Sequence, residues 1–196
     1  MAYLVGAVLL GELVGSSADS TQTFTEHFNN DTSRFGDIAG SSALIVAALL
    51  IVPLGLSLRQ RLSGETPELK VDLVAGLAIL SASGLLLSAG LLVTAPLWQS
   101  FGDLFDDPGM EPAVAAGVAQ AGIAVLLATL FVLAAWTFLA ASLARKAGRI
   151  PRWLSIAGWV AATLALFGIT GAAALPLGLW WVALGWWWRR DLTSEP

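Results

Sequence analysis

Few residues of this sequence have the chemistry for a binding or catalytic site, and the clearest of them is Glu12, which interrupts the apolar run YLVGAVLLGELVG. A carboxylate inside a bilayer costs about 2.5 to 3.5 kcal/mol on insertion scales, so it should face other helices or a partner. Gln120, Ser81 and Ser88 also stand in apolar segments. Together the four predict a polar, outward-facing ligand pocket. The alternative is that Glu12 reaches the outer headgroups and Gln120 makes an interhelical hydrogen bond.

The segment SSADSTQTFTEHFNNDTSRFGD supplies the apolar part of the predicted pocket. Phe24 and Phe28 share a face with Phe35 if the segment is helical, with polar residues opposite. This spacing predicts a short amphipathic helix that lies on the membrane or covers the pocket. His27, the one histidine of the chain, stands beside Glu26. Such a pair favours a solvated contact over a catalytic base or a metal ligand.

Metal and cofactor chemistry has little support in the sequence. The segment DLFDDPGMEP gathers Asp103, Asp106, Asp107 and Glu111, but its spacing matches no EF-hand, and a solvated turn is the simpler interpretation. One histidine and no cysteine cannot form a His-rich zinc site or a bis-histidine haem site. No Walker loop or nucleophile elbow is present. We therefore expect no metal, no cofactor and no catalytic residues, although an enzyme using Glu12, His27 or the acidic cluster remains a third hypothesis.

The composition is that of an integral membrane protein. The 196 residues are 57% hydrophobic and 12% charged, with a mean hydropathy of +0.77, whereas soluble domains are about 25% charged. Basic residues form no stripe with interleaved aromatics, so nucleic acid is not an expected partner.

Six apolar segments approach the roughly 20 residues that a membrane crossing needs. The sequence thus predicts a single all-α domain over residues 1–196, a six-transmembrane-helix bundle with a short amphipathic helix in the first outer loop. Between residues 154 and 188 only a tight hairpin near Gly171 to Pro176 leaves room for two crossings. The predicted spans are residues 2–17, 40–58, 71–95, 112–143, 153–171 and 173–189.

The basic residues set the expected orientation. Nine of the ten lysines and arginines fall on one side of the six-span scheme, and Arg34 falls on the other. Cytoplasmic loops carry an excess of Lys and Arg, so this side is predicted to be cytoplasmic, with both termini inside. The nine residues are Arg59, Arg61, Lys70, Arg145, Lys146, Arg149, Arg152, Arg189 and Arg190.

Small residues and tryptophans indicate how the helices contact each other and the membrane surface. Ser81, Gly84 and Ser88 share one helix face, which we expect to point inward. Trp180 and Trp181 are expected to pack on neighbouring helices or lipid. Trp186 to Trp188 precede two arginines and are expected at the cytoplasmic headgroup level. Stripes of small residues at four-residue spacing offer further close contacts at Ala7, Gly11 and Gly15, at Ala113, Gly117 and Ala121, and at Ala157, Ala161 and Ala165.

Two stretches of the sequence carry a family resemblance. ADSTQTFTEHFNNDTSRFGDIAGSSAL resembles the outer segment of uncharacterised actinobacterial six-span proteins, and GRIPRWLSIAGWVAATLALFGI with PLGLWWVALGWWWRR resembles their entry to span 5 and their C-terminal end. The resemblance covers most of residues 16–190. It implies a bacterial six-span topology and no particular activity, and the short N-terminal segment departs from the pattern.

The sequence favours a non-enzymatic protein of the plasma (inner) membrane that binds a lipid or small amphiphile from the outer side. The expected site comprises Glu12, Ser81, Ser88, Gln120, Phe24 and Phe28. The alternative is an accessory or oligomerising subunit without a ligand site, packed on copies of itself or on another membrane protein. The expected partners are therefore membrane lipids and a homo-oligomer or membrane-protein partner.

Overall fold

A computed structural model of the chain describes residues 31–64, 68–105, 110–167 and 174–193. Within these ranges the fold is all-α, apart from short turns. Its elements are α3 (Asp31–Leu62), α4 (Glu68–Phe105), α5 (Pro112–Lys146), α6 (Arg152–Phe167) and α7 (Ala174–Thr193).

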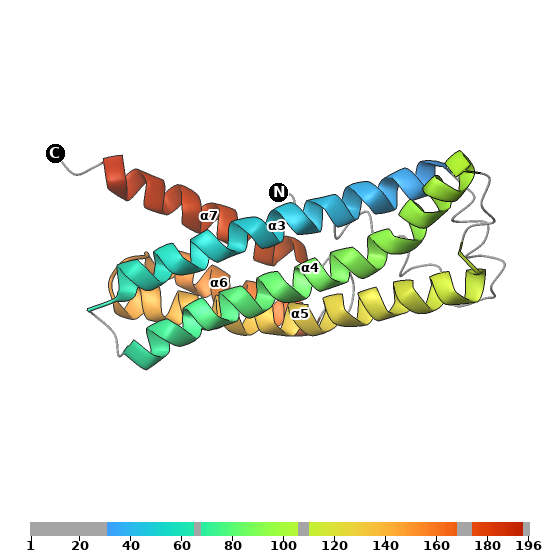
Figure 1. Cartoon of the computed structure of the whole chain (residues 1–196). Coiled ribbons are helices and arrows are strands. Elements are labelled where there is room, and N and C mark those ends of the chain that lie inside the picture. The colour runs from blue at the N-terminus through green and yellow to red at the C-terminus, as the bar shows by residue number, and fades with distance from the viewer. Residues whose placement is uncertain (1–30, 65–67, 106–109, 168–173, 194–196) are drawn as a thin grey trace.

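Three long helices form the body of the fold. Helices α3, α4 and α5 run side by side, α6 lies against one half of α5, and α7 leaves the bundle at an angle (Figure 1). Each helix packs chiefly on the helix before it in the sequence. The chain reverses at both ends of the bundle, so the end of α3, the start of α4, the end of α5 and the start of α6 meet at one end.

The charges divide between the two ends of the bundle. One end, which we call the basic end, carries Arg59 and Arg61 of α3, Lys70 of α4 and Arg145 and Lys146 of α5. The end of α7 lies on the same side (Figure 1). The opposite, acidic end carries the start of α3, the end of α4 and the start of α5.

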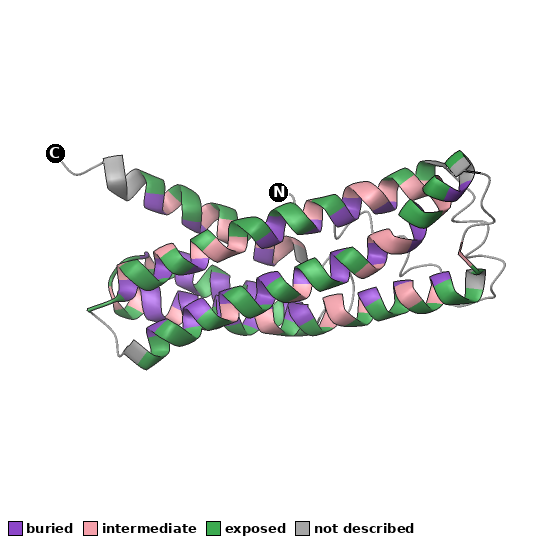
Figure 2. Cartoon of the chain, in the orientation of Figure 1, coloured by how far each residue is buried: buried purple, intermediate pink, exposed green. Residues whose placement is uncertain are grey.

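Three helices have the length and hydropathy of a membrane span: Thr32–Leu62, Leu69–Gly102 and Ala113–Lys146. Their outer faces are exposed and rich in leucine, whereas the buried residues line their contacts (Figure 2). Pro53 and Pro96 lie inside α3 and α4, which membrane helices tolerate. The chain is therefore an all-α, multi-pass membrane protein.

The expected count of six spanning helices is not supported. The described residues form five helices, and α6 is a shorter apolar helix of 16 residues, about 24 Å at 1.5 Å per residue. Helix α7 ends in a tryptophan- and arginine-rich segment that lowers its mean hydropathy. The predicted first span, residues 2–17, and the predicted amphipathic helix around Phe24 and Phe28 lie outside the described residues.

The helices also extend beyond the predicted boundaries. Helix α3 begins at Asp31 instead of residue 40, and α4 continues to Phe105, beyond the predicted boundary at residue 95 and into the segment DLFDDPGMEP that was interpreted as a solvated turn. Polar residues at the membrane surface do not stop a helix, because the backbone hydrogen bonds continue from residue to residue. Gly64, with φ of 91°, follows α3 in the left-handed conformation that glycine favours.

Candidate functional site

The residues predicted for the outward-facing pocket are only partly described. Glu12, Phe24 and Phe28 lie outside the described residues, as does His27. Ser81 and Ser88 are buried, and Gln120 is exposed on α5.

Both serines use their hydroxyl groups within the protein. Ser81 Oγ donates to the Leu77 carbonyl one turn earlier, at 2.8 Å. Ser88 Oγ donates to the Gly122 carbonyl of α5, also at 2.8 Å. Ser81 and Ser88 were predicted to lie on an inward face of their helix, and their burial in α4 confirms this prediction.

Gln120 does not join this contact. Successive residues on a helix are about 100° apart, so Gln120 points to the side of α5 roughly opposite Gly122, which faces α4. Helices α4 and α5 are close together at Gly122: a Cβ added there would lie only 2.8 Å from Leu92 Cγ. The described residues therefore place Ser88 in a tight helix contact and Gln120 on the outer surface.

The small-residue stripe predicted at Ala113, Gly117 and Ala121 does not pack on another described helix, because all three residues are exposed. Ala115 and Ala119 are buried instead. Helix α5 is apolar on most of its circumference, so its sequence pattern does not identify the side that faces α4.

A tryptophan cluster fixes α7 against α5 and α6. Trp136 and Trp181 stack with ring centroids 3.9 Å apart. Trp181 Nε1 donates to Thr137 Oγ1 at 3.1 Å, and Trp180 Nε1 donates to the Leu154 carbonyl at 2.7 Å. The expectation that Trp180 and Trp181 pack on neighbouring helices is confirmed, because both indoles contact residues of α5 or α6.

The tryptophans near the basic end differ in their exposure and in their contacts. Trp186 is exposed and Trp187 meets Trp153 edge to face, which agrees with a position near the headgroups. Trp188 is buried, and the Arg61 guanidinium lies 5.2 Å from its ring centroid. The indole of Trp188 therefore packs against α3 through a cation–π contact, while its expected position at headgroup level stays a prediction.

A pocket of about 450 Å³ opens between α3 and α4 at the basic end. We call it the α3–α4 pocket. Its lining combines apolar and polar side chains and consists of Leu56, Arg59, Gln60, Ser63, Val71 and Asp72.

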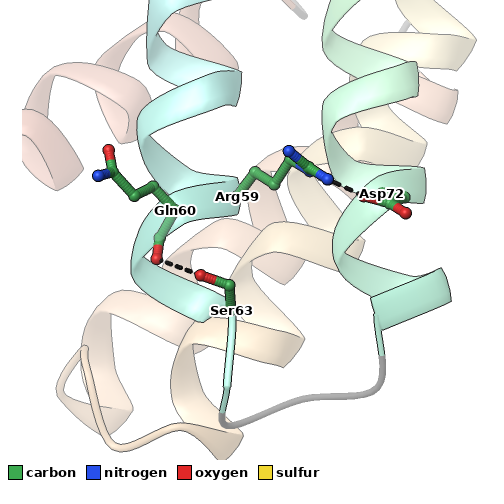
Figure 3. Close-up of polar contacts among 4 residues, drawn as sticks. All are labelled: Arg59, Gln60, Ser63 and Asp72. Carbon is green, nitrogen blue, oxygen red and sulfur yellow. Dashed lines mark hydrogen bonds and ion pairs between the residues drawn. The ribbon is translucent and has the colours of Figure 1, made fainter.

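An ion pair joins the two walls of this pocket. Arg59 Nε donates to Asp72 Oδ1 at 2.7 Å, and the two side chains are 53% and 55% exposed. Figure 3 shows them pointing toward each other from α3 and α4. An exposed pair of this kind contributes about 0 to 1 kcal/mol to stability, so its charges remain accessible to a ligand at small cost.

The other two polar residues of the pocket, Gln60 and Ser63, do not take part in the ion pair. Ser63 Oγ donates to the Gln60 carbonyl at 2.7 Å, closing the last turn of α3. The Gln60 side chain points away from the ion pair (Figure 3). Arg59 and Asp72 are therefore the two charged groups that the α3–α4 pocket offers to a ligand.

This pocket was not predicted, because Arg59, Gln60 and Ser63 fall between the predicted spans 40–58 and 71–95, where no helix was expected. One available signal was the pair of opposite charges on either side of the connection, Arg59 and Asp72, thirteen residues apart. Two antiparallel helices joined by a short connection bring such residues to the same level.

Within the described ranges, no group of three His, Cys, Asp or Glu side chains could hold a metal ion. Glu111 is exposed at the start of α5, and Asp106 and Asp107 lie outside the described residues. Comparison with known proteins adds no assignment: no family model, curated protein or solved structure matches the chain.

Proposed function

We propose that this membrane protein binds a lipid or another small amphiphile in the α3–α4 pocket. The observation that carries the proposal is the composition of the pocket wall. Leu56 and Val71 supply apolar surface, and Arg59 and Asp72 supply charge beside it. An amphiphile needs the same two surfaces next to each other, and ligand pockets typically combine apolar walls with a few polar groups.

The position of the pocket along the helices supports this proposal. Leu56 and Ser63 are seven residues apart on α3, which corresponds to about 10 Å along the helix axis. The charged residues lie toward the basic end and Leu56 lies deeper in the apolar part of α3. A ligand that follows this gradient would place its headgroup at Arg59 and its apolar part at Leu56.

The topology completes the proposal. We assign the basic end to the cytoplasmic side of a bacterial plasma membrane, because nine of the ten basic residues belong to it. We also propose six crossings, with residues 2–17 as the first and with α6 and α7 forming the last two. In this arrangement both termini are cytoplasmic.

The outward-facing pocket predicted from the sequence stays a separate prediction. Its residues Glu12, Phe24 and Phe28 lie outside the described ranges. Among the described ones, the hydroxyl of Ser88 already binds the α5 backbone. The α3–α4 pocket is thus the better supported site for the same class of ligand.

Native mass spectrometry of the full chain, released gently from nanodiscs, tests the proposal by measuring retained lipid and oligomer mass together. Leu56→Trp should fill the pocket and reduce retained lipid by about tenfold, the change that 1.4 kcal/mol produces. Leu49→Trp is the matched control, because Leu49 is an exposed leucine two turns away on α3 that does not line the pocket.

Arg59→Gln should also reduce retention, whereas Arg152→Gln, which removes an exposed arginine outside the pocket, should not. Equal retention by Leu56→Trp and Leu49→Trp would refute the site. A lipid-free homo-oligomer of the native sequence would instead support the accessory or oligomerising subunit.

A further inference from the structure

We infer that the α3–α4 pocket selects a zwitterionic headgroup, one that carries a phosphate and a primary ammonium together. This inference rests on the proposed lipid site and adds the chemical class of its ligand. It is carried by the arrangement of Arg59 and Asp72, which present one positive and one negative group at the same level of the pocket.

The two charges come from different helices and meet through a single contact, between Arg59 Nε and Asp72 Oδ1. Both side chains are about half exposed. The guanidinium has five N–H donors in a planar fork that suits a phosphate, and the carboxylate accepts hydrogen bonds from an ammonium. A zwitterion therefore gives each member of the pair a new partner of opposite charge.

A headgroup with only one sign of charge fits the pocket less well. A purely anionic headgroup bound to Arg59 would lie close to the Asp72 carboxylate, which repels it. A purely cationic headgroup bound to Asp72 would likewise be repelled by the Arg59 guanidinium. The pair in the α3–α4 pocket thus favours a ligand with both charges and disfavours either charge alone.

Neighbouring basic residues do not remove this selectivity. The Arg61 guanidinium lies over the Trp188 ring and is directed toward α7. Lys70 is two residues from Asp72 on α4, about 200° around the helix, and does not line the pocket. Arg59 and Asp72 therefore determine the charge that a ligand meets in the pocket.

The test measures headgroup preference in the full-length protein by native mass spectrometry with equimolar phosphatidylethanolamine and phosphatidylglycerol. The native chain should retain phosphatidylethanolamine preferentially. Asp72→Asn should lower this preference by about fivefold, equivalent to about 1 kcal/mol, because the ammonium loses its partner and the anionic lipid loses its repulsion. Glu111→Gln, which removes an exposed carboxylate at the acidic end, should leave the preference unchanged.

A thermal unfolding measurement verifies that Asp72→Asn is folded. An unchanged preference in folded Asp72→Asn, or equal retention of both lipids by the native chain, would overturn the inference. These results are distinguishable from failure of the lipid site itself, which Leu56→Trp reports through total retention.

A soluble zwitterion shares the same charges, so phosphoethanolamine serves as the second probe. Failure of millimolar phosphoethanolamine to displace bound phosphatidylethanolamine would support a lipid as the source of the headgroup. Displacement would overturn that source and assign the charge pair to a soluble ligand.

Discussion

Substituting Gly158 by alanine should destabilise the protein, although alanine normally favours a helix. A Cβ at this position would lie 2.7 Å from the Trp180 ring and 2.9 Å from Ala141 Cβ. Trp180 also donates its indole N–H to the Leu154 carbonyl at 2.7 Å. The new methyl group would therefore push on a ring held between three helices.

The magnitude follows from three contributions. Alanine is favoured over glycine inside a helix by about 0.8 to 1.0 kcal/mol. Overpacking a close contact costs about 1 to 3 kcal/mol, and a weakened hydrogen bond adds about 0.5 to 1.5 kcal/mol. Gly158→Ala should thus lower the free energy of unfolding by about 0.5 to 3.7 kcal/mol.

The assay is reversible unfolding by sodium dodecyl sulfate in mixed micelles, followed by circular dichroism. Gly185→Ala is the control, since a Cβ at Gly185 on α7 meets nothing within 4 Å. That variant should be unchanged or slightly stabilised. The interpretation of the α6–α7 contact is refuted if Gly158→Ala unfolds at the same detergent fraction as Gly185→Ala, or at a higher one.

Three further predictions concern the helix contacts and the orientation. Ser88→Ala removes the hydroxyl that links α4 to the α5 backbone and should cost about 0.5 to 1.5 kcal/mol in the same unfolding assay. Arg61→Gln removes the cation–π contact with Trp188 and should cost about 0.5 to 1 kcal/mol. The chain has no cysteine, so single cysteines at Ser63 and Glu111 can map the topology. An impermeant thiol reagent should label intact cells at position 111, and position 63 only after lysis.

Each of these predictions has a control and a contradicting result. Ser83→Ala, which removes an exposed hydroxyl bonded only within α4, should unfold like the native chain, and an equal effect of both serine variants would contradict the interhelical role. Arg152→Gln is the control for Arg61→Gln. Labelling of position 63 in intact cells would reverse the proposed orientation.

The sequence predicted which segments are helical better than it predicted where the helices end. Segments 40–58, 71–95 and 112–143 each lie inside one described helix, because long apolar runs leave a membrane-embedded backbone no other way to satisfy its hydrogen bonds. Hydropathy marks the part of a helix in contact with lipid. The helical turns at Asp31 and at Phe105 lie beyond that part, so hydropathy does not predict them.

The side of a helix that packs on its neighbours was predictable only where polar residues mark that side. Ser81 and Ser88 identify the inward face of α4, and both are buried. Helix α5 has small and apolar residues all round, so the exposed positions of Gln120 and Gly117 depend on packing that its own sequence does not specify. The Arg59–Asp72 pair likewise follows from the way two helices meet across a connection.

The order of helix contacts has a consequence for how the chain folds. Since each described helix packs mainly on its predecessor, most contacts are available as soon as the next helix has been synthesised, which favours rapid formation of native pairs. The Trp136–Trp181 stack is an exception, because it joins α5 to the last helix. Assembly of the described helices can therefore proceed during translation, and the stacking of these two indoles follows once α7 has been synthesised.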